Sequence, residues 1–311
     1  MARPGVWVLD RFAPGAEELH LAELLTARGV ASRWLNWDEL SFGIGGQWWY
    51  RGAPVAPPAA AVVRSRVFTR ATDLAVLLDS LRLMEGAGVR LINSADAIAA
   101  AHNKVRGADV LAAAGLDVPP TRLVRTIEEA GRCLLDWSEV VFKPLTGHAT
   151  IGLARLSLEP RDTEDTPPGV SMYQEMQLWH MLRHHSALCA QEYVAHPGPE
   201  LRVVVVDGDV VACNRRTLRI TDTTGDRGLG GAQMTPAECT PGIARVATTA
   251  VAALRLSHAA VDILEAPRGL VVVEVNPMIS RWIEMDRLGL HSTEHGVGPR
   301  LADAVAAQAS A

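Results

Sequence analysis

Three oxygen-bearing side chains near the C-terminal end of the chain could bind a metal ion together. Asp262 lies on one apolar, β-branched segment, and Glu274 and Asn276 lie on the next, with a Pro-Arg-Gly turn between the segments. This pattern predicts an antiparallel hairpin. Folding it about Arg268 places Asp262 opposite Glu274, and Asn276 shares the face of Glu274 because side chains on a strand repeat every second residue.

The pairing of two carboxylates favours a divalent cation between them. Carboxylates that face each other across a ladder lie ~5 Å apart and repel each other unless positive charge intervenes. Mg²⁺ prefers hard oxygen ligands and often completes its coordination with water and substrate phosphates. The alternative is a solvent-facing hairpin edge whose acids only add solubility, but almost all flanking residues are apolar. The sequence therefore predicts a magnesium site on this hairpin.

A second hairpin gathers several arginines. The Asp-Gly turn at 207–208 is a strong hairpin signal, and mirroring the chain about it sets Glu200 opposite Arg215. Arg202, Arg215 and Arg216 then cluster at the open end of this hairpin. Such a cluster suits a polyphosphate, whereas a row of exposed ion pairs would contribute little. A cation site and a basic cluster in one unit together favour a nucleotide–Mg²⁺ complex.

A Gly- and Thr-containing turn from Lys143 to Gly152 joins two strands, and Lys143 itself stands where the preceding strand ends. The backbone N–H groups of such a turn can cover phosphates. It is not a P-loop, because a P-loop leads into a helix. Lys143 could reach a phosphate from beneath, and Lys104 is a second candidate. An ordinary hairpin turn and a solvated lysine remain the alternatives.

Composition limits the classes of function. A net charge of −5 gives no indication of a nucleic-acid-binding surface, and 48% hydrophobic with 21% charged residues is typical of a globular protein. The four cysteines form no CxxC pair, which favours free thiols in a reducing compartment. No apolar stretch has the length of a signal peptide or a membrane span. We therefore expect a cytoplasmic protein with no nucleic-acid or membrane partner; a homo-oligomer is left open.

The elements that must position these residues begin with alternating strand and helix signals. Strands are predicted at 6–9, 31–37, 59–66 and 89–93, and helices at 16–28 and 72–85. This order favours a parallel sheet with helices on its faces. A second unit begins near Ser94, a suitable N-cap. A third begins near Ala190 and ends with the metal hairpin.

From about Val62 to Met278 the chain resembles the RimK-like branch of the ATP-grasp superfamily, ATP-dependent carboxylate–amine ligases. The matching motifs follow the family order: Leu91-Ile92-Asn93-Ser94 with Ala97-Ile98 and Asn103-Lys104; Leu111 to Gly115 with Val118-Pro119-Pro120-Thr121; Val141-Phe142-Lys143-Pro144; Gln191-Glu192-Tyr193-Val194; Glu200-Leu201-Arg202; and Asp262 with Glu274-Val275-Asn276. The resemblance implies an α/β and α+β ATP-grasp fold in three parts. These are an N-terminal Rossmann-like (pre-ATP-grasp) domain, 1–93, a central lid domain, 94–189, and a C-terminal ATP- and Mg-binding domain, 190–311.

The resemblance also implies a role for each matching residue. Lys104 and Lys143 would contact ATP phosphates, and the turn with Gly147, Thr150 and Gly152 would form a lid over them. The hinge strand that reads adenine would comprise Gln191, Glu192, Tyr193 and Val194. Glu200 would hold the ribose, and Arg202 and Arg215 would lie near the phosphates and act in catalysis. Asp262, Glu274 and Asn276 would hold one or two Mg²⁺ (or Mn²⁺) ions.

The implied activity is formation of an amide or peptide bond through an acyl phosphate. Glutamate or another amino acid would be added to a small-molecule or peptide carboxylate. The sequence contains no GxSxG nucleophile motif, which is expected because such a reaction depends on positioning and charge neutralisation. An ATP-grasp kinase and a non-catalytic, ATP-binding regulatory subunit are the alternatives.

The chain departs from the family after Asn276, where relatives often carry small residues. Here Arg281 and Trp282 predict a bulky, cationic acceptor wall, with Arg281 pairing a substrate carboxylate and Trp282 stacking on a ring. Arg64 and Arg66, at the C-terminal end of a predicted strand, could also contact substrate, because ligands bind there in open α/β sheets.

Overall fold

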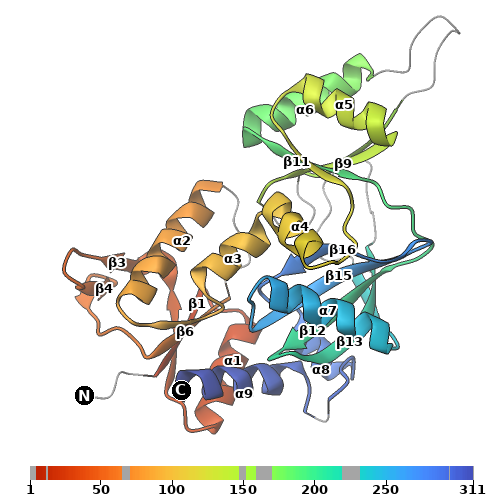
Figure 1. The fold of residues 1–311 in the computed structure, drawn as a ribbon. Coiled ribbons are helices and arrows are strands. Elements are labelled where there is room, and N and C mark those ends of the chain that lie inside the picture. Colours follow the sequence, from red (N-terminus) through yellow and green to blue (C-terminus); the bar gives the residue numbers. More distant parts are fainter. Residues whose placement is uncertain are drawn as a thin grey trace, which may run out of the picture.

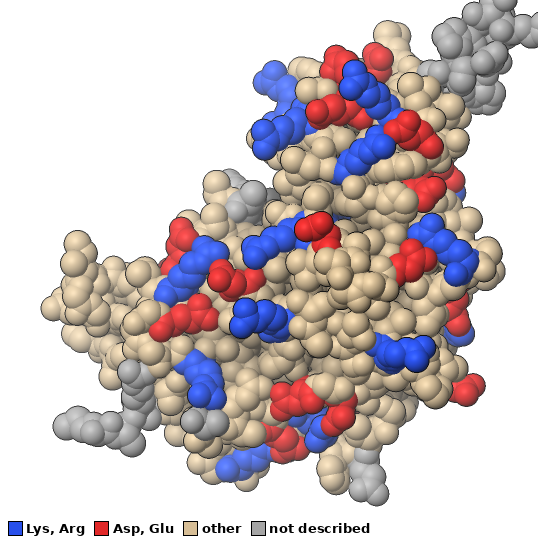
Figure 2. Space-filling model, viewed as in Figure 1, with Lys and Arg blue, Asp and Glu red and all other residues tan. Residues whose placement is uncertain are grey.

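The computed structural model describes residues 5–11, 13–64, 71–146, 152–158, 170–218, 232–293 and 295–310. These residues form three main sheets and one small meander, with helices packed on the sheets (Figure 1). On the face seen in Figure 2, the acidic and basic side chains of the described residues are interspersed and form no large patch of one sign. No helix in the described ranges combines the length and the apolar character that crossing a bilayer requires.

The N-terminal sheet is parallel, as predicted, with the strand order β2-β1-β6-β7. Its strands are β1 (Val6–Asp10), β2 (Ser32–Asn36), β6 (Ala60–Val63) and β7 (Arg90–Ile92). Strands β1 and β6 are buried and, apart from Asp10, apolar, because hydrophobic clusters that include helical residues cover both faces. The helices that contribute these residues include α1 (Ala16–Ala27) and α2 (Ala71–Gly86). The short elements between β2 and β6 are η1 (Trp37–Glu39), β3 (Leu40–Phe42), β4 (Trp48–Tyr50) and β5 (Ala53–Pro54), and β3 to β5 form the meander.

Two helices lead into the central sheet. Ser94 caps α3 (Ala95–His102) and Asn103 caps α4 (Lys104–Ala113), each through a side-chain oxygen. The sheet has the order β10-β9-β11-β8 and consists of β8 (Thr121–Val124), β9 (Glu139–Pro144), β10 (Ala154–Ser157) and β11 (Leu188–Glu192). Helices α5 (Ile127–Trp137) and α6 (Met172–His185) cover its outer face (Figure 1). The predicted boundary between residues 189 and 190 falls inside β11.

The C-terminal sheet is antiparallel, with the order β14-β13-β12-β15-β16. Its strands are β12 (Glu200–Val206), β13 (Asp209–Leu218), β14 (Ala232–Pro236), β15 (His258–Ala266) and β16 (Gly269–Asn276). Helix α7 (Pro241–Ala253) packs on one face, and α8 (Trp282–Arg287) and α9 (Val297–Ser310) pack on the other. Helix α9 shares one hydrophobic cluster with the N-terminal sheet, so the first and last parts of the chain have a common core.

A buried histidine at the start of β15 predicts acid sensitivity. Burial, and secondarily the charge of Arg64, lowers the pKa of His258 to about 3. The folded protein therefore keeps this ring neutral while the unfolded chain protonates it below its ordinary value of 6.5. Protonation of His258 should therefore leave the free energy of unfolding unchanged above pH 6.5 and should lower it as the pH falls from 6.5 towards 3.

Between pH 7.5 and about 5.5, the free energy of unfolding of the wild type should fall by about 1.4 kcal/mol more than that of the His258→Asn variant, because asparagine does not titrate in this range. Urea unfolding of both proteins at the two pH values measures the difference. Equal losses in the two proteins would contradict the assignment of this sensitivity to His258.

Candidate active site

The two predicted metal-binding carboxylates face each other across β15 and β16. Asp262 pairs with Glu274, which confirms the predicted pairing. The local geometry differs, because the turn occupies only positions 267–268 and Ile263 pairs with Val272. A bulge between Asp262 and Ile263 restores the opposition of the two acids. Bulges often re-aim side chains next to active sites in this way.

Lysines from two other elements approach Glu274. The Nζ of Lys104, at the start of α4, lies 3.2 Å from Glu274 Oε1. Burial alone would raise the pKa of Glu274, but Lys104 and Lys143 lower it to about 2, so Glu274 is ionised at neutral pH. Lys143 on β9 is itself held by Gln191, whose Oε1 accepts a hydrogen bond of 2.6 Å. Burial lowers the pKa of Lys143, against the charge of Glu274.

Two arginines approach Asp262 from the other side. Arg202 Nη1 lies 3.7 Å from Asp262 Oδ1, and Arg216 Nη2 lies 3.0 Å from Asp262 Oδ2. Arg216 also forms an ion pair with Glu200. Burial, followed by the charge of Asp262, raises the pKa of Glu200 to about 7, although Arg216 lowers it in part. The site thus alternates acids and bases over one face of the C-terminal sheet.

The predicted partner of Glu200 is wrong. Glu200 pairs with Arg216, because a register shift between Val204 and Val205 adds one residue to β13. Side chains alternate between the faces of a sheet, so a shift of one residue moves Arg215 to the opposite face. There Arg215 pairs with Glu265 and not with the site. Arg216, predicted in the basic cluster but without a catalytic role, takes the place of Arg215 at the site.

The side chains present fit a hard divalent cation. Asp262 is 2% exposed, yet its Oδ1 has no hydrogen-bond partner among the described residues. Arg202 Nη1 lies 3.7 Å from this oxygen and compensates its charge without a hydrogen bond, so the oxygen can still bind a cation. Asn276 donates its Nδ2 to Asp262 Oδ2 over 3.1 Å and lies beside the two acids. The described residues contain no cluster of three His, Cys, Asp or Glu side chains, so an ion here would also need water and phosphate ligands.

The predicted adenine strand connects the central and C-terminal sheets. The backbone N–H groups of Glu192 and Tyr193 already bond to Pro120 O and Glu139 O, each over 2.9 Å. The Tyr193 ring lies 3.6 Å from the guanidinium of Arg155. Gln191 is buried and bridges Lys143 to Thr121, and Val194 packs with Leu264 and Val271. The adenine contacts of this strand remain a prediction.

The predicted phosphate lid is described only at its end. Gly147 and Thr150 lie outside the described residues. Arg66, which was predicted to contact substrate and not to belong to the lid, also lies outside them. Gly152 has a φ of +73°, and a Cβ there would meet Pro144 Cγ at 3.2 Å. Glycine is therefore the residue that fits this position.

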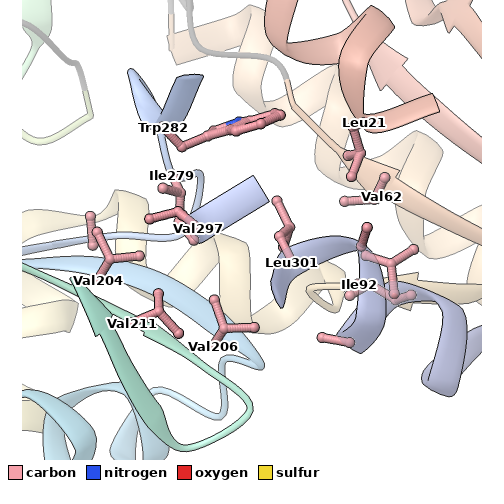
Figure 3. Close-up of a cluster of buried hydrophobic side chains, with 14 of the residues drawn as sticks. Leu21, Val62, Ile92, Val204, Val206, Val211, Ile279, Trp282, Val297 and Leu301 are labelled. Carbon is pink, nitrogen blue, oxygen red and sulfur yellow. The ribbon is translucent and has the colours of Figure 1, made fainter. Parts of the chain in front are cut away.

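Two of the predicted substrate contacts are wrong. Trp282 is fully buried and stacks on His20, and Figure 3 shows its ring inside the cluster that includes Leu21 and Ile279. A ring with no exposed surface cannot stack on a substrate. Arg64 is also fully buried and pairs with acids of α1. Arg281 binds Glu284 over 2.7 Å, and its contact with a substrate remains a prediction.

Known proteins match this chain in sequence and in fold. The sequence model of the RimK-like ATP-grasp domain matches residues 101–287. The tetrahydromethanopterin:alpha-L-glutamate ligase of Methanosarcina acetivorans is 31% identical over 192 residues, which cover 61% of this chain and 58% of that protein. The ribosomal protein bS6–L-glutamate ligase of Escherichia coli O139:H28 (strain E24377A / ETEC) is 30% identical over 202 residues, 63% of this chain and 62% of that protein. The match thus spans about three fifths of the length of these curated relatives.

A solved structure of the ATP-grasp ligase PsnB, complexed with a minimal precursor, Mg and ADP, superposes with a TM-score of 0.66. The superposition covers 98% of both chains at 21% sequence identity, which shows that the two share a fold. The family match extends over more than half of the chain and contains every described charged residue of the site. The protein therefore belongs to the RimK-like ATP-grasp family.

Proposed function

We propose that the protein is a ligase that joins a carboxylate to an amine with Mg·ATP and forms ADP. The observation that carries the proposal is the convergence of Asp262, Glu274 and Asn276 with cationic side chains from four separate elements. These side chains are Lys104, Lys143, Arg202 and Arg216, from α4, β9, β12 and β13. Such a surface matches the charge of a triphosphate and its cation.

In the proposed reaction, a carboxylate oxygen of the acceptor attacks the γ-phosphorus of ATP, and the bond to the β–γ bridging oxygen breaks. The amine nitrogen then attacks the acyl carbon, phosphate leaves, and the nitrogen loses a proton. Arg202 and Arg216 would neutralise charge on the transferred phosphoryl group, and the two lysines would bind the phosphates of the nucleotide. A bound Mg²⁺ would supply further charge neutralisation.

The named relatives support a proposal for the substrate class. Two of them are named as glutamate ligases, and PsnB was also solved with the precursor peptide PsnA2 and AMPPNP. We therefore propose glutamate or another amino acid as the amine, and a small-molecule or peptide carboxylate as the acceptor.

The test is ADP release by the purified protein with ATP, Mg²⁺ and panels of acids and amino acids, followed by mass spectrometry. We expect ADP release that requires both an acid and an amine, with a product equal to their sum minus water. A stable phosphorylated acid formed without an amine would indicate a kinase. Nucleotide binding without any substrate-dependent ADP release would contradict the proposal.

A further inference from the structure

One asparagine from the N-terminal sheet ties the open end of the metal hairpin. Asn93 follows β7 and is 3% exposed. Its Oδ1 accepts hydrogen bonds from Ser257 N (2.7 Å), Ser257 Oγ (2.9 Å) and His258 N (3.3 Å). Its Nδ2 donates to His258 O (3.0 Å) and Pro277 O (2.9 Å). Both polar atoms of this buried amide are therefore fully used.

These contacts lie at the two strand ends that lead to the metal-binding side chains. His258 begins β15, which carries Asp262, and Pro277 directly follows Asn276 at the end of β16. The strands are antiparallel, and Ala260 pairs with Asn276, so both ends lie side by side. Asn93 thus fixes the first residue of β15 relative to the end of β16.

Two more side chains of the N-terminal unit continue this attachment. Arg64 Nη1 donates to Ile279 O over 2.6 Å, and Glu17 Oε1 accepts from Trp282 N over 2.6 Å. Arg64 and Glu17 also bind each other over 3.1 Å. We call Glu17, Arg64 and Asn93 the N-terminal clasp. The clasp holds three backbone groups between Pro277 and Trp282, immediately after Asn276.

We infer that the N-terminal clasp is a positioning element for the divalent-cation site. This inference rests on the proposed function, because it assigns the cation to Asp262, Glu274 and Asn276. Mg²⁺ requires nearly ideal octahedral coordination by six oxygens, so it tolerates little displacement of its ligands. Outer residues that orient metal ligands typically change metal affinity by about 10–100-fold when they are replaced. Asn93 acts on two ligand-bearing strands at once, so its loss should act on the cation more than on the nucleotide.

The test measures binding of Mn²⁺ to the full chain in the presence of ADP, by the electron paramagnetic resonance signal of free Mn²⁺. The Asn93→Ser variant removes both donations to His258 O and Pro277 O. We expect its Mn²⁺ affinity to fall by about 10–100-fold, with ADP affinity in the absence of metal unchanged. The milder Arg64→Lys variant keeps the charge beside Glu17 and decides the question if Asn93→Ser does not fold. For Arg64→Lys we expect the Mn²⁺ affinity to fall roughly threefold or more.

The matched control is Asp286→Ala, which removes two side-chain bonds to Val297 N and Gly298 N at the start of α9. It should lower the melting temperature and leave Mn²⁺ affinity within about twofold, because the Asp286 side chain bonds to the start of α9 and not, among the described residues, to β15 or β16. Wild-type affinity in a folded Asn93→Ser or Arg64→Lys variant would overturn the inference, as would an equal loss in Asp286→Ala. A wild-type protein that binds ADP but no Mn²⁺ would overturn the proposed cation site and the inference together.

Discussion

The Asp262→Asn variant is expected to lose about 10³-fold in acceptor-dependent ADP formation, on the order of 4 kcal/mol of transition-state stabilisation. Asparagine has the same shape but no charge to attract a cation. Asp262 is also the acid that Arg202 and Arg216 share, so its neutralisation leaves two guanidinium groups less well compensated. Steady-state rates at saturating ATP, measured over a range of Mg²⁺ concentrations, give the size of the loss.

A second acid on the same strand provides the control. Glu265 lies near the turn of the metal hairpin and pairs with Arg215, away from the site. Glu265→Gln should retain activity within about threefold, because it alters only a partly exposed ion pair. If both variants lost activity equally, or if Asp262→Asn retained most of it, the assignment of Asp262 to the cation would be wrong.

The second large effect distinguishes two adjacent arginines. Arg216→Met should lower kcat/KM by about 10²-fold or more, because its guanidinium lies 3.0 Å from Asp262 and faces the expected phosphates. Arg215→Met should change kcat/KM by no more than about threefold, because Arg215 lies on the opposite face. The two substitutions are chemically identical and one residue apart, so the comparison isolates the face of the strand.

The reverse order of effects would contradict the observed register. A large loss of kcat/KM for Arg215→Met with little loss for Arg216→Met would instead support the pairing of Glu200 with Arg215 that a simple two-residue turn predicts. Circular dichroism and melting temperatures of both variants separate loss of catalysis from loss of folding.

Much of the fold was predictable because local patterns determine it. Buried apolar runs alternate with helical segments in the N-terminal sheet, and Ser94 caps α3 as a serine at that position should. The opposition of Asp262 and Glu274 also followed from the sequence. It followed in part by coincidence, because the predicted turn was one residue too long and the unpredicted bulge compensates for it.

The errors arose where one residue or a distant partner decides the geometry. A bulge inserts a single residue, and both bulges lie within runs of valine that contain no glycine or proline to mark them. Arg64 resembled a ligand contact because its partner Glu17 lies 47 residues earlier in the chain. Trp282 follows a serine and an arginine, so nothing local indicates that its ring enters the core shared with α1 and α9.

The most direct test of the cation site is anomalous diffraction from a crystal grown with Mn²⁺ and a non-hydrolysable ATP analogue. We predict an anomalous peak within bonding distance of oxygens of Asp262 and Glu274 and of the phosphates, and near Asn276. Nucleotide bound with no ion at these oxygens, or an ion bound elsewhere in the protein, would contradict the proposed site.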